Sequence, residues 1–251
     1  MVRRSLLVSS VVALLIGLPA AAVAEDKPRD VAIGVVTNAP PMSVLDENGT
    51  YTGLSNDILH RVAELENLKL NYQPMKFAAL IPALQAGQIE MAVSGIFVTE
   101  ERKRVVDFST PYYTQGALLV APENSKITDV ASLKGKTVAA EQGSAALAVA
   151  NKHAAEWGIT VRVIQDVSKI QLAMKIGDVD AMIGDSGLLA YMIRTRGNPA
   201  KVKIIGDVID PTGVAFAFPR GSNLTSVINA GMAKMKDSGE LDKIKQKYQL
   251  D

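Results

Sequence analysis

The stretch that indicates the fold is residues 91–102, MAVSGIFVTEER. Its first part, Met91 to Ser94, is a short apolar run typical of a buried strand, and Gly95 predicts a turn. Thr99 then predicts the start of a short helix, because its hydroxyl can accept a hydrogen bond from a free N–H group of the first turn. A strand that leads through a glycine into a helix is the repeating unit of an α/β fold.

The same alternation continues on both sides of this stretch. Strands are expected at 31–36, 68–73, 91–94, 137–140, 161–164, 181–183 and 202–205. Helices are expected at 56–65, 77–86, 144–157, 167–176, 186–196, 224–236 and 241–248. These elements form two α/β units. The segments 115–121 and 213–218 are extended, and we expect them to run side by side as a double hinge, with the last two helices returning to the first unit.

Composition excludes several classes of protein. The chain has 251 residues, of which 48% are hydrophobic and 21% charged, as in a globular protein. The net charge of +1 leaves no basic excess for nucleic acid. Without cysteine there is no disulfide and no thiolate chemistry. The two histidines, His60 and His153, lie among charged neighbours and are expected at the surface, so we expect no metal site and no cofactor.

The first 24 residues have the pattern of a secretory signal peptide. Arg3 and Arg4 precede the apolar run Leu6 to Leu18, and Ala22-Val23-Ala24 has the small residues that signal peptidase accepts. We predict cleavage after Ala24 and a periplasmic location. Cleavage removes two basic residues and no acidic one, which leaves 25 basic and 26 acidic side chains and a net charge of −1. A membrane anchor is the alternative, and the breaks at Gly17 and Pro19 argue against it.

Arg102 is the first candidate site residue. It follows a glycine turn and lies in the first turn of a predicted helix, where unpaired N–H groups and a planar guanidinium both suit a carboxylate. The alternative is a surface arginine paired with Asp107 or with water.

A set of motifs resembles bacterial extracellular solute-binding proteins of the polar amino-acid uptake family. The resemblance covers nearly the whole chain after residue 24 and rests on the strand 31–36, Pro40-Pro41, Asp46-x-Asn48-Gly49, LIPALQAG at 80–87, Ser94-Gly95, Thr99-x-x-Arg102, DFSTPYY at 107–113, LKGK at 133–136, QGS at 142–144, Gly177-x-x-Asp180-Ala181 and Asp185.

The resemblance implies a fold and a function. The fold is the two-lobed periplasmic-binding-protein fold of type II, with a first lobe at 25–115, a hinge at 116–121, a second lobe at 122–210, a returning hinge strand at 211–218 and first-lobe helices at 219–251. The function is that of a monomeric receptor that closes on a small zwitterionic solute and delivers it to the membrane permease of an ABC importer.

Carried over residue by residue, the resemblance also implies a binding site. It gives Arg102 the ligand's α-carboxylate, Asp185 its α-ammonium and Phe77 a stacking face. It gives further contacts to the backbone around Ser94, Gly95, Gly143 and Ser144. Read without the resemblance, Asp185 is a helix N-cap and Phe77 an ordinary core residue of an amphipathic helix.

The departures from the family pattern bear on the ligand. Ala39 and Met42 stand where many members have aromatic residues, and Val36 stands where some relatives have an acid. Phe97 replaces a Thr or Ser, and with Phe77 it is similar to the aromatic pair of ectoine-binding members, although it could equally face the core. We expect a zwitterion, with neutral, basic and ectoine-like compounds ahead of acidic ones.

Two other functions fit the same fold. Some related proteins resemble cyclohexadienyl dehydratases, and Glu141, beside Gln142-Gly143-Ser144, is the one carboxylate placed to act as an acid or base. In a binding protein the same residue is a candidate ligand contact. A sensory module is the third possibility, and we expect such a module to be fused to a membrane helix and an output domain, neither of which is seen here.

Overall fold

The computed structural model describes residues 27–195, 198 and 201–248. The predicted signal peptide and its cleavage site therefore lie outside the described residues. Within this part of the chain no helix is both long and apolar enough to cross a membrane. It also holds no cluster of three or more His, Asp or Glu side chains suited to a metal ion.

The first lobe contains the elements up to residue 108 and the two C-terminal helices. They are β1 (Arg29–Val35), β2 (Asn38–Ala39), β3 (Ser43–Leu45), β4 (Tyr51–Thr52), α1 (Leu54–Leu65), β5 (Leu68–Pro74), the 3-10 helix η1 (Phe77–Ala79), α2 (Leu80–Gln85), β6 (Met91–Phe97), α3 (Glu100–Lys103), β7 (Val106–Phe108), α7 (Leu224–Asp237) and α8 (Glu240–Lys247).

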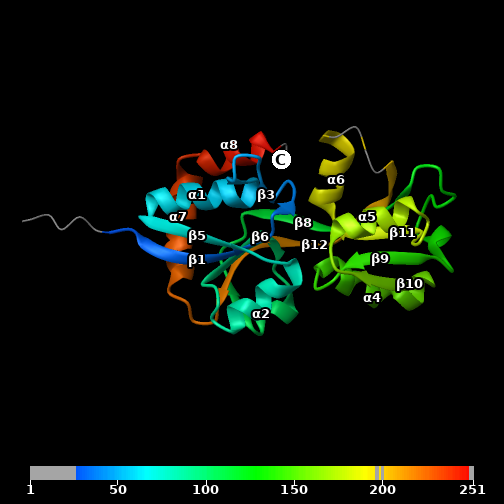
Figure 1. Ribbon diagram of the computed structural model, residues 1–251, viewed down its shortest axis with the longest axis horizontal. Helices are drawn as coiled ribbons and strands as arrows, with labels where there is room; N and C mark the ends of the chain where they lie inside the picture. The colour runs from blue at the N-terminus through cyan, green and yellow to red at the C-terminus, as the bar shows by residue number, and fades with distance from the viewer. Residues whose placement is uncertain (1–26, 196–197, 199–200, 249–251) are drawn as a thin grey trace, which may run out of the picture.

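The second lobe follows the same strand and helix alternation. It contains the 3-10 helix η2 (Ala131–Leu133), β9 (Thr137–Glu141), α4 (Ala145–Trp157), β10 (Thr160–Ile164), α5 (Val167–Lys175), β11 (Ala181–Asp185) and α6 (Ser186–Thr195). Two long strands, β8 (Tyr113–Pro122) and β12 (Val202–Pro219), belong to both lobes. Figure 1 shows α1, α7 and α8 at one end of the molecule and α4, α5 and α6 at the other.

One sheet runs through both lobes in the order β10-β9-β11-β8-β12-β6-β1-β5, and β7 pairs with β12 beside this path. β1 pairs with β5 and β6 in parallel, whereas β8 and β12 pair with each other antiparallel. The chain therefore crosses between the lobes twice, on neighbouring strands. This is the two-lobed α/β fold with two extended crossings that the sequence predicts.

Each lobe has its own core on both faces of its part of the sheet. In β8, Leu119 packs in one core of the second lobe and Leu118 and Val120 in the other, because neighbouring side chains on a strand point to opposite faces. In the first lobe, Ile33 and Phe216 pack with α1 and α7 on one face, and Ile96 packs with α2 on the other. Strands buried on both faces explain the continuous apolar runs in the sequence.

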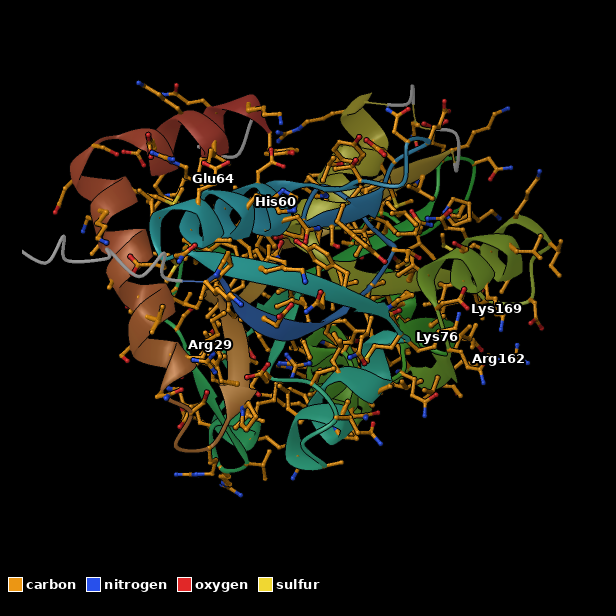
Figure 2. All side chains as sticks on the ribbon, turned by 60° about the vertical axis from the view of Figure 1, so that its left-hand side comes forward. Arg29, His60, Glu64, Lys76, Arg162 and Lys169 are labelled. Atoms are coloured by element: carbon orange, nitrogen blue, oxygen red, sulfur yellow. The ribbon has the colours of Figure 1, made fainter. Side chains whose placement is uncertain are left out.

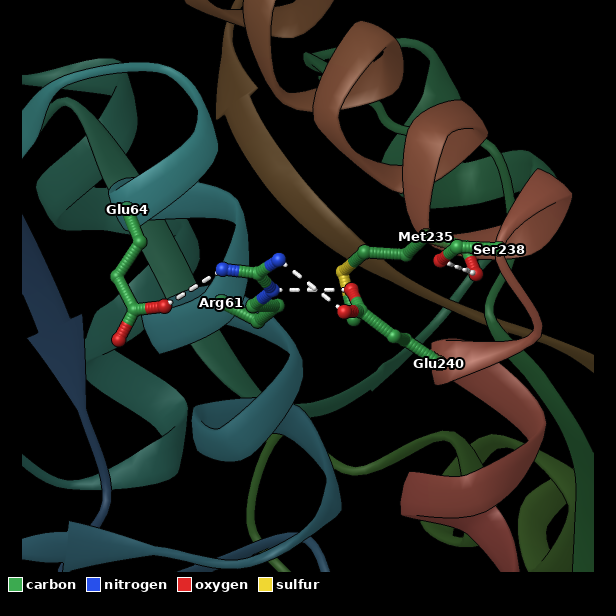
Figure 3. Close-up of polar contacts among 5 residues, drawn as sticks. All are labelled: Arg61, Glu64, Met235, Ser238 and Glu240. Atoms are coloured by element: carbon green, nitrogen blue, oxygen red, sulfur yellow. Dashed lines mark hydrogen bonds and ion pairs between the residues drawn. The ribbon is translucent and has the colours of Figure 1, made fainter.

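The C-terminal helices are held against α1 by hydrogen bonds and ion pairs. The Arg61 guanidinium donates to both carboxylate oxygens of Glu240 at 2.9 and 3.1 Å and to Glu64 at 2.9 Å (Figure 3). At the end of α8, Lys247 and the Tyr248 hydroxyl both donate to Asp57, at 2.6 and 2.7 Å. Two-pronged pairing of this kind fixes helix position as well as contributing charge attraction.

The histidines are not fully at the surface, which corrects the expectation from sequence. His60 is half-buried, its Nε2 lies 2.9 Å from the Tyr72 hydroxyl, and burial lowers its pKa. His153 is also partly covered, because its ring stacks on Trp157 with 4.7 Å between centroids. An aromatic residue covers each ring, Tyr72 of β5 edge-on at His60 and Trp157 of the same helix stacked on His153, and charge patterning in the sequence does not reveal either contact.

Candidate functional site

Arg102 lies between the two lobes. The Thr99 hydroxyl caps the short helix α3 by accepting from the Arg102 N–H at 3.2 Å, and this places the arginine side chain in the first turn. Only 8% of Arg102 is exposed. Its Nη1 donates to the Phe97 carbonyl in the first lobe and its Nη2 to the Gly143 carbonyl in the second, both at 2.9 Å. The surface pairing with Asp107 is not found, because that carboxylate accepts from the Gly221 N–H instead.

The Phe77 ring lies against the Arg102 guanidinium. Phe77 begins the 3-10 helix η1, is half-buried, and its ring centroid lies 5.4 Å from the Arg102 Cζ. A guanidinium over an aromatic face is attracted by the ring's quadrupole, most strongly where water is excluded. Burial lowers the pKa of Arg102, and the nearby Asp185 carboxylate partly offsets this, although an arginine stays charged in either case.

A small cavity lies beside this pair, between the lobes. It is lined by Val36, Asn38, Ala39, Pro40, Met42, Phe77, Ser94, Gln115, Glu141, Val167, Asp185 and Leu188. Its volume is about 30 Å³, roughly that of one water molecule. A second, more open hollow of about 540 Å³ adjoins it and shares Val36, Asn38, Phe77, Glu141 and Val167. A molecule of amino-acid size can enter the inner cavity only when the lobes separate.

Asp185 ends β11 and lies directly before α6, opposite Ala117 of β8. Burial raises its pKa to about 6, and the positive charge of Arg102 opposes this shift. The alternative role as a helix cap goes to another residue, because the Gly187 N–H in the first turn of α6 donates to the Gln115 side chain at 3.1 Å. The Asp185 carboxylate is thus left facing the cavity.

Glu141 is the last residue of β9 and lines both hollows. Burial raises its pKa to about 7, with further increases from the negative charges of Asp185 and Asp166, while Lys76 lowers it. The structure therefore brings two carboxylates and one guanidinium to a single cleft. These groups can hold a zwitterion. The protein's guanidinium can donate to the ligand's carboxylate, and a protein carboxylate can accept from the ligand's ammonium.

The remaining predicted contacts lie around the cavity. The Ser94 hydroxyl lines it but is engaged by main chain, accepting from the Val36 N–H at 2.8 Å and donating to the Val93 carbonyl. Ser144 caps α4 by accepting from the Leu147 N–H at 3.0 Å. Gly95 and Gly143 both have positive φ, and their backbones approach Met42 and Ala78 so closely that an added Cβ would lie 2.8 and 3.1 Å away.

Phe97 does not form a wall of the cavity. It is 3% exposed and packs in the first-lobe core with Val93 and Tyr112. Residues 93 and 97 share a face of β6, and that face is covered by α1, whereas Ser94 on the other face reaches the cavity. The core orientation left open by the sequence is the one observed, and Phe77 is the one described aromatic side chain that lines the cavity.

Sequence reasoning missed Gln115 and Asn38 among the lining residues. Gln115 is 4% exposed and is the one amide in the apolar stretch of β8, which is the signal that could have identified it. Asn38 lies in the short strand β2 and donates to the Ser168 hydroxyl across the cleft at 3.5 Å. Val36, Ala39 and Met42 also line the cavity, which agrees with the expectation of a less polar first-lobe wall.

An ion pair crosses the mouth of the outer hollow. Lys76, next to η1, lies 3.4 Å from the Asp166 carboxylate, which caps α5 in the second lobe. Lys169 approaches the same carboxylate at 3.6 Å, and Figure 2 shows Lys76 and Lys169 near each other on this side of the molecule. The two lobes therefore touch at Arg102, at Asn38 and at Lys76.

A larger hollow, of about 1330 Å³, lies on the second lobe beside α5 and contains none of the predicted site residues. Leu172 and Ile176 are exposed there. The charged groups that could recognise a zwitterion are instead in the interlobe cleft, so the cleft is the candidate site.

Known proteins share this sequence and this structure. The arginine-binding extracellular protein ArtP of Bacillus subtilis (strain 168) is 29% identical over 80% of this chain and 79% of its own length. The lysine/arginine/ornithine-binding periplasmic protein of Escherichia coli (strain K12) is 28% identical over 94% of each chain. A solved structure of an ancestral arginine-binding protein bound to arginine has a TM-score of 0.80 and 34% identity, over 87% of this chain and 97% of its own.

All three similar proteins are named for binding an amino acid, as expected for a binding protein rather than an enzyme such as a dehydratase. One of the three is named as extracellular and another as periplasmic. The family described as bacterial extracellular solute-binding proteins, family 3, matches residues 31–251. The match covers most of the chain, and the chain therefore belongs to this family of solute-binding proteins.

Proposed function

We propose that this protein is the receptor of an ABC importer for an amino acid with a basic side chain. The observation that carries the proposal is the charge pattern between the lobes, where Asp185 of the second lobe lines the cavity and interacts electrostatically with Arg102 of the first lobe, which lies beside the cavity. Arg102 binds the ligand's α-carboxylate and Asp185 its α-ammonium, so both lobes must close on the same molecule. Phe77 provides an apolar face for the first part of the side chain.

The similar proteins support a basic ligand. Their names give arginine, or lysine, arginine and ornithine, as what they bind. An acidic amino acid would bring a second carboxylate next to Glu141, and like charges in a partly dry site repel strongly. Neutral and ectoine-like zwitterions remain in the predicted range and rank below the basic amino acids.

The same proposal includes export and a membrane partner. The chain is cleaved after Ala24, works in the periplasm as a monomer, and delivers its ligand to a permease in the inner membrane. Mass spectrometry of a periplasmic extract tests the first point: a species that begins at Glu25 is expected, and one that retains Arg3 and sediments with membranes would contradict it.

A thermal-shift screen tests the ligand class. The mature chain is melted with each of the protein amino acids and with opines, betaines and ectoine. A ligand at a hundred times its dissociation constant adds about 2.7 kcal/mol to the stability of the folded protein, which is easily visible as a higher melting temperature. Arginine, lysine and ornithine are expected to give the largest shifts, and the proposal fails if no amino acid gives one.

A further inference from the structure

Two carboxylates in the cleft lack a hydrogen-bond donor in the part of the chain that the structure describes. Among the described residues, no side chain or backbone N–H donates a hydrogen bond to the carboxylate of Glu141 or of Asp185, although both line the cavity. Arg102 is near Asp185, but its guanidinium donates to the main-chain carbonyls of Phe97 and Gly143. Both carboxylates are half-buried, and a carboxylate partly removed from water without a donor is disfavoured, so a cationic donor would stabilise each of them when the lobes are together.

The α-ammonium of an amino acid brings one positive charge to these two carboxylates. In the proposed binding mode it pairs with Asp185, and the charge of Glu141 is left unmatched. The other charged groups that face Glu141 are Asp185, Asp166 and Lys76. Lys76 is drawn to Asp166, with 3.4 Å between nitrogen and oxygen, and Asp166 also has Lys169 at 3.6 Å. The site consisting of Arg102, Asp185 and Glu141 therefore has one negative charge more than a neutral amino acid can balance.

The position of Glu141 suits the far end of a long side chain. It lines the inner cavity next to Asp185 and also the adjoining hollow of about 540 Å³, and Phe77 lines both as well. A side chain that extends from the inner cavity into the adjoining hollow therefore lies beside both the Phe77 ring and the Glu141 carboxylate. A guanidinium or ammonium at its end can stack on the ring and donate to the carboxylate at the same time.

We propose that Glu141 selects the ligand by the charge of its side chain, accepting a cation when ionised and losing that preference when protonated. This inference rests on the proposed function and names the residue that sets its substrate class. Because Arg102 and Asp185 hold only the α-groups, they bind charged and neutral side chains alike. Discrimination between arginine and a neutral compound of the same shape then falls to Glu141.

The proton on Glu141 is linked to the ligand. Burial, with Asp185 and Asp166 nearby, raises the pKa of Glu141 to about 7 when the lobes are together. A cation next to the carboxylate stabilises its ionised form, so closing on arginine leaves Glu141 ionised, whereas closing on a neutral ligand near neutral pH takes up a proton. As the pH falls below about 7, the neutral ligand gains affinity from this proton and arginine does not, so the preference for arginine falls. Asp185 titrates as well, but it binds the α-ammonium, so its protonation weakens all amino acids equally.

Arginine and citrulline provide the test. Citrulline replaces the guanidinium by a neutral urea group of almost the same shape, so the ratio of its dissociation constant to that of arginine measures charge selection alone. The variant is Glu141→Gln, and the control is Glu47→Gln, which removes one negative charge from an exposed turn that lines neither hollow of the cleft. Calorimetric titrations of the mature chain give each constant.

The wild-type protein and the Glu47→Gln control are expected to prefer arginine strongly. In Glu141→Gln the dissociation constant for arginine is expected to rise about 30-fold or more, while the dissociation constant for citrulline changes by less than about threefold. An unchanged ratio in Glu141→Gln would overturn the role of Glu141. If the wild type binds neither compound nor any other amino acid, the proposed function itself is wrong.

A second measurement needs no variant. For the wild type, the ratio of the two constants is expected to fall about tenfold between about pH 8 and pH 6, because fewer molecules then have an ionised Glu141. A ratio that stays constant over this range would contradict the protonation part of the proposal. The pH series on the wild type also tests the role of Glu141 if the Glu141→Gln variant does not fold.

Discussion

At the scale of single residues, Arg102 has the most demanding position. Its guanidinium is almost completely removed from water, and it is held by one carbonyl from each lobe and by the face of Phe77. Interactions of a charged group are strong in such surroundings because little water competes for them. The arginine therefore joins the lobes, and under the proposed function it also presents a donor to the ligand's carboxylate.

Replacing this arginine is the first prediction. Arg102→Ala is expected to weaken amino-acid binding by about 30-fold or more, because the ligand carboxylate would enter a partly dry site without a counter-charge. Folding should be retained, since the arginine lies at the rim of the cleft and not in a core. Calorimetry and circular dichroism measure the two effects, and Arg104→Ala, an exposed neighbour, is the control. Tight binding by Arg102→Ala would show that the carboxylate is held elsewhere.

Phe97 gives the second prediction. Phe97→Thr removes a ring from the first-lobe core and buries a hydroxyl, so we expect it to lower the free energy of unfolding by about 3 kcal/mol or more. The order of ligand affinities should not change. Phe77→Thr should do the opposite and weaken binding with a smaller loss of stability, because Phe77 is half-buried at the cavity. Urea denaturation and a thermal-shift series distinguish the two variants, and a new ligand preference in Phe97→Thr would contradict the core assignment.

The sequence could predict the charged members of the candidate site but not all its walls. Arg102 follows a turn glycine and a capping threonine, so its place at the start of a helix can be predicted from its neighbours in the sequence alone. The orientation of Phe97 depends on which face of β6 meets α1, and both faces of that strand are buried and apolar. Gln115 enters the cavity only because β8 crosses between the lobes, which is a property of the whole sheet.

At the scale of elements, most strands and helices begin and end within a few residues of where the sequence places them. The exception is β12, which was expected as a strand at 202–205 and a separate return strand from 211. It is one strand of 18 residues, because both halves pair with β8, and the turn-forming residues between them are accommodated as irregularities in register after Ile205 and after Ile209. Pairing with a long neighbour outweighed the local turn signal.

The contact between α1 and α7 gives the third prediction. A Cβ added at Gly231 of α7 would lie 2.7 Å from the Val62 Cγ1 of α1, and Val62 is fully buried. Crowding in a packed interface costs about 1 to 3 kcal/mol, and alanine returns about 1 kcal/mol in helix propensity. Gly231→Ala is therefore expected to lower the free energy of unfolding by about 1 kcal/mol.

Urea denaturation measures this loss. The exposed Ala233→Gly in the same helix reports the propensity contribution separately. A more stable Gly231→Ala protein would mean that α7 can move away from α1 without loss, which the fastening of α8 to Arg61 and Asp57 argues against.

At the scale of the whole molecule, closure of the lobes is coupled to protons. With the lobes together, burial raises the pKa of Asp185 to about 6 and that of Glu141 to about 7. With the lobes apart both carboxyls face water, and their pKa values return to about 4. At pH values between about 4 and about 7 the closed form binds more protons than the open form, so lowering the pH through this range favours closure. The advantage is lost as the pH rises through about 7.

Small-angle X-ray scattering of the protein without ligand measures this fourth prediction. The radius of gyration is expected to be smaller at about pH 5 than at about pH 8, and the difference should shrink in Glu141→Gln. Equal radii, or a more compact protein at the higher pH, would contradict it. Arginine added at the higher pH should produce the compact form by supplying the cations that both carboxylates need.

Under the proposed function the cleft binds an amino acid through charges contributed by both lobes, and a titration with arginine and agmatine measures the part that the α-carboxylate plays. Agmatine is arginine without its α-carboxylate, so it keeps the side chain and the amine but offers nothing to Arg102. Arginine is expected to bind one molecule per chain, and agmatine about 30-fold or more weakly. Agmatine bound as tightly as arginine would contradict the account, because Arg102 would then have no part in holding the ligand.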